Sequence, residues 1–244
     1  MNSGLKTPTV YTVIIAVTMC VIISLCTAFI CFTIAPPDEV AIGAYQRVIV
    51  IDAGHGGIDR GTIGVVTGNY ESDLNLWTAR LLYQKLEAVG LRSIMTRQDE
   101  NGLYGDLSPG FKRRDMQRRA EIIKQSSPII TISIHMNKYT APTRRGAQVY
   151  YQKGDSSAQS LANAIQSTLN AEINLTEGGR SFSSLAGDYY VCRVSPCPAV
   201  IVECGFLSNP EDDRLLDTEE YRQKIANAIK NGICEYLALM TIAP

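Results

Sequence analysis

From residue 47 onward, short apolar segments alternate with longer amphipathic segments, and this alternation constrains the fold most strongly. The run VIVIDAG at 48–54 has no polar face, which is typical of a strand buried on both sides. Residues 71–89 instead repeat leucines at helical spacing and end at Gly90. We expect further strands at 91–97, 128–135, 146–152, 189–194 and 198–205, and helices at 111–125, 156–171 and 218–240. The alternation predicts an α/β domain over 47–244 with a mixed, largely parallel sheet.

The N-terminal segment 11–35 differs from everything that follows it. It carries no charged residue over 25 positions, and a helix of this length would rise about 37 Å, enough to cross a hydrocarbon core of about 30 Å. Lys6 precedes the segment and Asp38 follows it, so residues 1–10 are expected in the cytoplasm and the rest outside. Residues 36–46 would form a linker. Because a signal-peptide core is shorter, we favour an uncleaved membrane anchor, and a cleaved segment with a secreted domain is the alternative.

Composition excludes some classes of function. Hydrophobic residues make up 45% of the chain and the net charge is −1, which fits a globular domain with an apolar segment and gives no reason to expect nucleic-acid binding. An exported domain permits a disulfide between Cys192 and Cys197. Cys204 and Cys234 are expected to be reduced thiols.

The chain has only two histidines, and both fall at the end of an expected strand. His55 follows VIVIDAG, and His135 closes ITISIH. Loops at the carboxyl ends of strands converge on one crevice, so the two imidazoles are expected to meet there. Two imidazoles suggest zinc, and a catalytic zinc needs a third protein ligand and an open position. Glu71 is the candidate third ligand; the alternative is an ordinary first-turn glutamate of the 71–89 helix.

Two further acidic residues lie beside the predicted crevice. Glu203 ends the apolar run of 198–205, and because a buried unpaired carboxylate is costly, it must be paired or face the crevice. A glutamate in that position is a candidate general base. Asp52, just before the His55 turn, would either orient His55 or cap the loop.

Four motifs in order carry a family resemblance: VIVIDAGHGGIDRG, a glutamate opening the next helix, ISIHMN and VIVECGFLSNPED. Together they resemble the zinc-dependent N-acetylmuramoyl-L-alanine amidases of the amidase type 3 family over about 47–240. The resemblance implies a sheet of about six strands with helices on both faces. It also implies one Zn²⁺ bound by His55, Glu71 and His135, Glu203 as catalytic acid and base, and peptidoglycan as the substrate. Asn137 and Arg97 match polar positions near the family's site and are expected to contact substrate.

A single anchored catalytic domain is most similar to the spore-cortex amidases of endospore formers. Their action precedes formation of muramic-δ-lactam, which germination enzymes recognise. This branch implies a location in the forespore or cortex space and an accessory activating lipoprotein as a partner. Two alternatives remain open: a zinc peptidase that cuts within the stem peptide, and a non-catalytic wall-binding domain on the same fold.

Overall fold

The fold is built around β3, Ile130–Asn137, which lies in the interior of a six-stranded mixed sheet in a computed structural model that describes residues 17–20 and 47–242. The strands run in the order β2-β1-β3-β6-β4-β5. All neighbouring pairs are parallel except β4 and β6. The other strands are β1 (Ile49–Ala53), β2 (Ser93–Met95), β4 (Gln148–Gln152), β5 (Leu185–Gly187) and β6 (Ala199–Phe206). The prediction of a single α/β domain with a mixed, largely parallel sheet of about six strands is confirmed.

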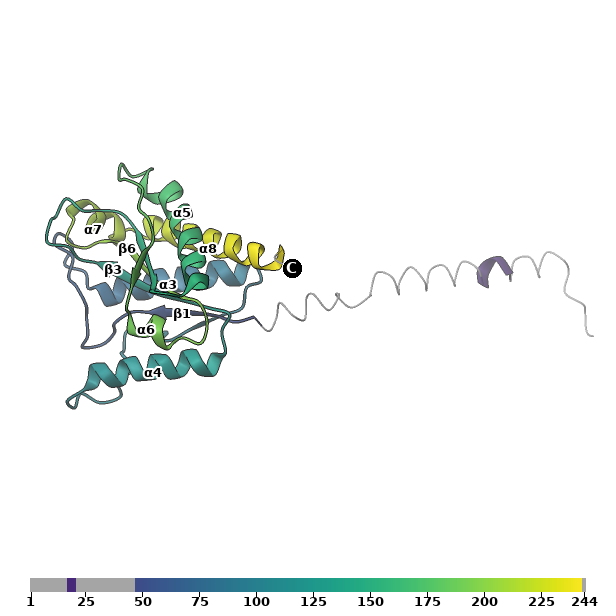
Figure 1. The fold of residues 1–244 in the computed structure, drawn as a ribbon, viewed down its shortest axis with the longest axis horizontal. Helices are drawn as coiled ribbons and strands as arrows, with labels where there is room; N and C mark the ends of the chain where they lie inside the picture. Colours follow the sequence, from purple (N-terminus) through teal and green to yellow (C-terminus); the bar gives the residue numbers. More distant parts are fainter. Residues whose placement is uncertain (1–16, 21–46, 243–244) are drawn as a thin grey trace, which may run out of the picture. The chain divides into compact units, whose positions relative to one another are not determined.

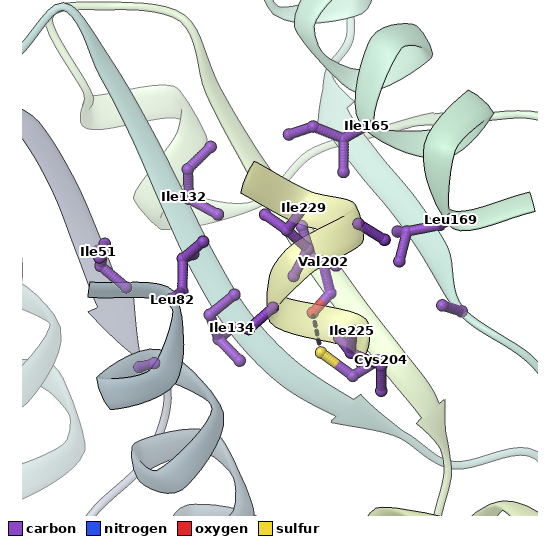
Figure 2. Packing of buried hydrophobic residues seen from close by; sticks show 14 of the residues in the cluster. Ile51, Leu82, Ile132, Ile134, Ile165, Leu169, Val202, Cys204, Ile225 and Ile229 are labelled. Atoms are coloured by element: carbon purple, nitrogen blue, oxygen red, sulfur yellow. Dashed lines mark hydrogen bonds between the residues drawn. The ribbon is translucent and has the colours of Figure 1, made fainter. Parts of the chain in front are cut away.

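One face of the sheet is apolar and fully covered. Alternate residues of the central strands, such as Ile51, Ile132 and Val202, point to this face and are completely buried. Helices α3 (Glu71–Ala88), α5 (Ser156–Leu169) and α8 (Glu219–Ile242) pack on it, and their side chains interlock with those of the strands in Figure 2. This layer holds the larger of the two cores and supplies most of the hydrophobic burial.

The opposite face carries polar residues and has a thinner cover. Helices α4 (Phe111–Ser126) and α6 (Tyr190–Val194) lie on this side, as Figure 1 shows. A small apolar cluster that includes Val50, Ile123 and Ile201 joins them to the sheet. Beyond it, towards the carboxyl ends of the strands, this face bears Ser133 and His135. The functional crevice is therefore expected on the α4 side of the sheet.

Three elements differ from the sequence prediction. Residues 189–194, predicted as a strand, form helix α6, because both edges of β6 are already paired with β3 and β4 and the segment instead packs its buried Val191 and Cys192 against the sheet. The short edge strand β5 was not predicted. Helix α7, Pro210–Asp217, was also missed, although Asn209 caps its first turn and a proline opens it.

The apolar segment predicted at 11–35 falls mainly outside the described residues. Within it, residues 17–20 are helical. Among the helices that the structure describes, none has both the length and the apolar composition needed to span a membrane. Cys192, Cys197, Cys204 and Cys234 are all free thiols, so the possible 192–197 disulfide is not formed.

The packing of α5 on α8 gives a test of this core. A Cβ atom added at Gly232 of α8 would lie 2.5 Å from the Ile165 Cα of α5. We expect Gly232→Ala to lower the free energy of unfolding by about 1 kcal/mol, because overpacking costs about 1–3 kcal/mol and alanine recovers about 1 kcal/mol of helix propensity. Urea unfolding followed by circular dichroism measures the change. The exposed Glu235→Ala on the same helix is the control, and equal stability of the two variants would contradict the packing.

Candidate metal and catalytic site

The turn after β1 carries His55 in an uncommon backbone conformation. His55 has a φ of 60°, in the left-handed region that residues with a side chain rarely adopt. Such conformations persist only where the surrounding structure imposes them, and they cluster at functional sites. In this turn, the backbone carbonyls are bound by buried side chains rather than by a neighbouring strand.

Arg119 of α4 holds this turn in place. Its guanidinium is 1% exposed and donates hydrogen bonds to the carbonyl oxygens of Ala53 at 2.6 Å and His55 at 2.5 Å. The charge is compensated by Asp52 at 2.7 Å and by Asp115 at 2.6 Å. The turn is thereby tied both to β1 and to α4.

Asp52 therefore acts on the turn through Arg119. Its carboxylate accepts hydrogen bonds from Thr96, Ser133 and Arg119, each at 2.7 Å, and none from the imidazole of His55. Burial alone would raise the pKa of Asp52, but Arg119 and the two hydroxyls outweigh it and lower the pKa to about 2. Of the two roles considered for Asp52, direct orientation of the His55 ring is not what the contacts show.

Arg97, which the sequence predicts to contact substrate, lies inside the fold, and its substrate contact stays a prediction. It is 3% exposed, and its guanidinium donates to the backbone carbonyls of Ala53, Gly54, Ser72 and Asp99. Burial lowers its pKa to about 10. In this structure the Arg97 side chain therefore supports the His55 turn from inside the fold.

His55, Glu71 and His135 come together at the carboxyl ends of β1 and β3. Each offers one ligand atom, and these atoms all lie within 4.8 Å of one another. The Glu71 Oε1 atom is 3.1 Å from His55 Nε2 and 2.9 Å from His135 Nδ1. The two imidazole rings stand edge to face with their centroids 5.0 Å apart. The sequence prediction that these three side chains converge agrees with this geometry.

Glu71 is held by the first turn of α3. Its Oε2 accepts a hydrogen bond from the Thr62 backbone at 2.8 Å, which leaves Oε1 for the histidines. Although burial opposes the charged form, hydrogen bonds from His135 and His55 place the pKa of Glu71 well below its usual range. The carboxylate is therefore ionised, as a metal ligand must be.

Gly54 makes room for His135. A Cβ atom at this position would lie 2.2 Å from two atoms of the His135 ring. The position directly after β1 must therefore lack a side chain, because the imidazole of His135 lies across it. This close approach explains the glycine that directly precedes His55.

Asp59 was missed by the sequence analysis. Its carboxylate lies 3.1 Å from His55 Nδ1 and also pairs with Lys112. A carboxylate on the far nitrogen of a ligand histidine fixes the ring and its tautomer. In the sequence, Asp59 is marked only by its position four residues after His55. That spacing alone does not predict a contact between the two side chains.

Glu203 lies beside the three candidate ligands on the neighbouring strand. Its Cα pairs with that of His135, so both side chains point to the same face of the sheet. The Glu203 Oε2 atom is buried and has no hydrogen-bond partner among the described residues. Burial raises its pKa to about 7. A carboxyl group in this state can exchange a proton near neutral pH.

Asn137 and Tyr150 extend the site beyond Glu203. Asn137 ends β3, is partly exposed, and its Oδ1 accepts a hydrogen bond from the backbone of Lys138. Burial raises the pKa of Tyr150, and the hydrogen bond from Asn137 opposes that rise. Asn137 thus stands at the rim, where its predicted substrate contact stays a prediction.

A crevice of about 280 Å³ opens next to these groups, between α4 and α6. His55, His135, Lys112 and Tyr189 are among the residues that line it. Two imidazole nitrogens and one carboxylate oxygen form a donor set suited to Zn²⁺. With a carboxyl group of raised pKa on the next strand, the arrangement fits metal-assisted hydrolysis.

The sequence matches a known protein family over nearly all of the described domain. Residues 49–235 match the model of the N-acetylmuramoyl-L-alanine amidase family. The germination-specific N-acetylmuramoyl-L-alanine amidase of Bacillus subtilis is 33% identical over 193 residues, which are 78% of this chain and 79% of that protein. The uncharacterized protein YqiI of the same organism is 32% identical over 216 residues, 87% of this chain and 96% of the relative.

Solved structures give the same result. The CwlD amidase of Clostridioides difficile, determined in complex with the GerS lipoprotein, superposes with a TM-score of 0.75 at 33% identity, covering 79% of this chain and 99% of that one. An N-acetylmuramoyl-L-alanine amidase from Clostridium difficile 630 has a TM-score of 0.69 at 29% identity, covering 79% and 97%.

The ion pair under the turn predicts a pH-dependent stability. A group whose pKa falls on folding stabilises the fold above its ordinary pKa, and this stabilisation is lost as the pH falls towards the folded value. For Asp52 the window runs from its ordinary 3.8 to about 2. We expect Asp52→Asn to lose about 3 kcal/mol at pH 7, because it leaves Arg119 buried with one carboxylate fewer, and to lose less at pH 3.

Urea unfolding at both pH values measures this. The same change at exposed Asp188 is the control. A loss for Asp52→Asn that is equal at pH 7 and pH 3 would show that the charge of Asp52 is not what stabilises the turn.

Proposed function

Because the chain belongs to the N-acetylmuramoyl-L-alanine amidase family, we propose that it uses zinc to cleave the amide bond between the lactyl group of N-acetylmuramic acid and L-alanine in peptidoglycan. One observation carries the proposal: three metal-ligand atoms converge, and one of them belongs to His135, which is paired with Glu203, whose buried carboxyl oxygen has no partner among the described residues. A buried carboxyl oxygen without a protein partner can form a hydrogen bond with a water or a substrate group.

His55, Glu71 and His135 would hold the metal. Three protein ligands are the number typical of catalytic zinc sites, whereas structural zinc sites have four. When bound, Zn²⁺ supplies a Lewis acid that polarises the scissile carbonyl and makes water more acidic. Asp59 and Arg119 keep His55 oriented towards the site, the first through the ring and the second through the backbone.

Glu203 would move the proton in both halves of the reaction. As a base it takes a proton from the attacking water, and as an acid it delivers that proton to the leaving nitrogen of L-alanine. An amine leaves poorly unless it is protonated, so one carboxyl group must perform both transfers. A pKa of about 7 suits a group that has to accept and release a proton in the same cycle.

We also propose a cellular setting, for which the relatives give support. A relative described as germination-specific supports a role in spore cortex, upstream of muramic-δ-lactam formation. We place the domain outside the cytoplasm, held by a membrane anchor at 11–35. A solved relative in complex with a lipoprotein supports an accessory lipoprotein as a partner here also.

The metal proposal is tested by zinc content. We expect the purified full chain to bind one Zn²⁺ per molecule, and Glu71→Gln to lower the affinity by at least about tenfold, because the neutral amide is a poorer ligand for the cation. Elemental analysis and titration with a competing chelator give both values. Glu87→Gln on the same helix is the control. Zinc bound equally well by Glu71→Gln would remove Glu71 from the ligand set, and occupancy that requires an added lipoprotein would support the accessory partner.

The catalytic proposal is tested by Glu203→Gln. We expect kcat to fall by about 10²–10⁴-fold, since general acid–base catalysis contributes about that factor, while zinc content stays unchanged. Product analysis must show a free N-terminal L-alanine and an intact lactyl group. The control is Glu121→Gln, a change at an exposed residue of α4. Cleavage elsewhere in the stem would favour a peptidase, and a wild-type chain that binds zinc but cleaves nothing would favour a wall-binding domain.

A further inference from the structure

A basic cavity of about 520 Å³ lies directly beyond the end of β3. Its lining includes three arginines, Arg144, Arg145 and Arg180, together with Tyr139 and Gly179. None of the described residues that line it is acidic. A cavity of one sign concentrates its field and attracts a ligand of the other sign.

Arg145 is already neutralised. It forms an ion pair with Glu211, and its Nε lies 3.4 Å from Asp212. The positive charge available to a ligand therefore comes from the other two arginines.

Arg144 is partly buried and lacks a counter-ion within the described part of the chain. Its Nη2 donates to the Gln148 side chain at 2.8 Å, which is a neutral acceptor. The Arg144 Nε is buried with no hydrogen-bond partner. The guanidinium lies over the rings of Tyr139, at 4.8 Å, and Phe206, at 5.3 Å, which further exclude water. A desolvated cation with an unused donor is stabilised by an anion.

Arg180 approaches the cavity from the segment after α5. Its guanidinium lies 5.2 Å from the centroid of the Phe182 ring, and that of Arg144 lies 6.0 Å from the same ring. Arg180 is exposed and makes no ion pair with any residue that the structure describes. Both guanidinium groups thus lie near the same Phe182 ring, and neither forms an ion pair with a residue that the structure describes.

The cavity is connected to the proposed catalytic carboxyl through one residue. Gln148, which accepts the hydrogen bond from Arg144, has its Cα paired with that of Glu203 across β4 and β6. Tyr139, which lines the cavity, follows Asn137 by two residues. The cavity is therefore close in the sheet to the position where the scissile amide would lie.

We propose that Arg144 and Arg180 form a subsite for a free carboxylate of the peptidoglycan stem peptide. The inference rests on the proposed function, which places the scissile amide beside Glu203. Stem peptides carry free carboxylates after L-alanine, and a guanidinium binds a carboxylate through paired, charge-assisted hydrogen bonds. The subsite would select stems with free carboxylates over stems in which these groups are amidated.

The first test compares two soluble disaccharide-tripeptide muropeptides, one with free stem carboxylates and one fully amidated. We expect the wild-type full chain to show a KM about tenfold lower for the free form, the size expected for one charge-assisted contact. Arg180→Gln should raise the KM for the free form about tenfold, leave its kcat unchanged, and leave the amidated form unaffected. The control is Arg92→Gln, which removes one exposed positive charge just before β2. Equal KM values of the wild type for both substrates, or equal losses of Arg180→Gln on both, would overturn the subsite.

A binding measurement separates this proposal from the proposed function. Titration calorimetry on Glu203→Gln, with the same two muropeptides, requires no turnover. We expect about tenfold tighter binding of the free form, abolished by a second change, Arg144→Gln or Arg180→Gln. If the wild type cleaves neither substrate but this preference persists, the subsite stands and the catalytic proposal fails. If cleavage occurs without any preference in binding, the subsite is refuted and the catalytic proposal stands.

Discussion

The buried guanidinium of Arg119 is the interaction on which the site depends. The His55 turn leaves the sheet, so its carbonyls lose their strand partners. Arg119 and Arg97 supply the missing donors to Ala53, Gly54 and His55. Arginine suits this task because its fork of donors serves several carbonyls at once. The charges would be prohibitive without Asp52 and Asp115, so the turn, β1 and α4 form one electrostatic unit.

The surroundings of the candidate metal site shift the pKa values of two glutamates in opposite directions. Glu71 lies between two imidazoles and receives hydrogen bonds that hold it ionised. Glu203, one strand away, receives none, and burial raises its pKa to about 7. Two carboxyl groups whose environments separate their pKa values are suited to different roles. This division supports Glu71 as the proposed ligand and Glu203 as the proposed acid and base.

The sequence was informative where local pattern and topology agree. Buried strands without alternation predicted the parallel centre of the sheet, and the strand ends predicted that His55 and His135 would meet. For residues 189–194 the same reasoning gave a wrong prediction. Their β-branched and aromatic composition fits a strand, but no edge of β6 is free to pair. The contacts of Arg97 and Asp59 could not be predicted from the sequence, because they depend on how the His55 turn packs against its surroundings. A sequence pattern identifies a polar side chain, but only the fold decides whether it faces a backbone carbonyl, an imidazole or the solvent.

The two faces of the sheet divide stability from chemistry. Three helices seal the apolar face, so the polar face can tolerate Ser133, His135 and Glu203 in a row that would otherwise weaken a core. Its thinner cover, α4 and α6, leaves a crevice at the ends of the strands. Next to Glu203, β4 contributes Gln148, and the Gln148 side chain accepts a hydrogen bond from Arg144. The charged groups thus change from acidic at Glu203 to basic at Arg144. The proposed substrate has a neutral scissile amide and a nearby carboxylate, which matches that change, because the amide would lie beside Glu203 and the carboxylate beside the arginines.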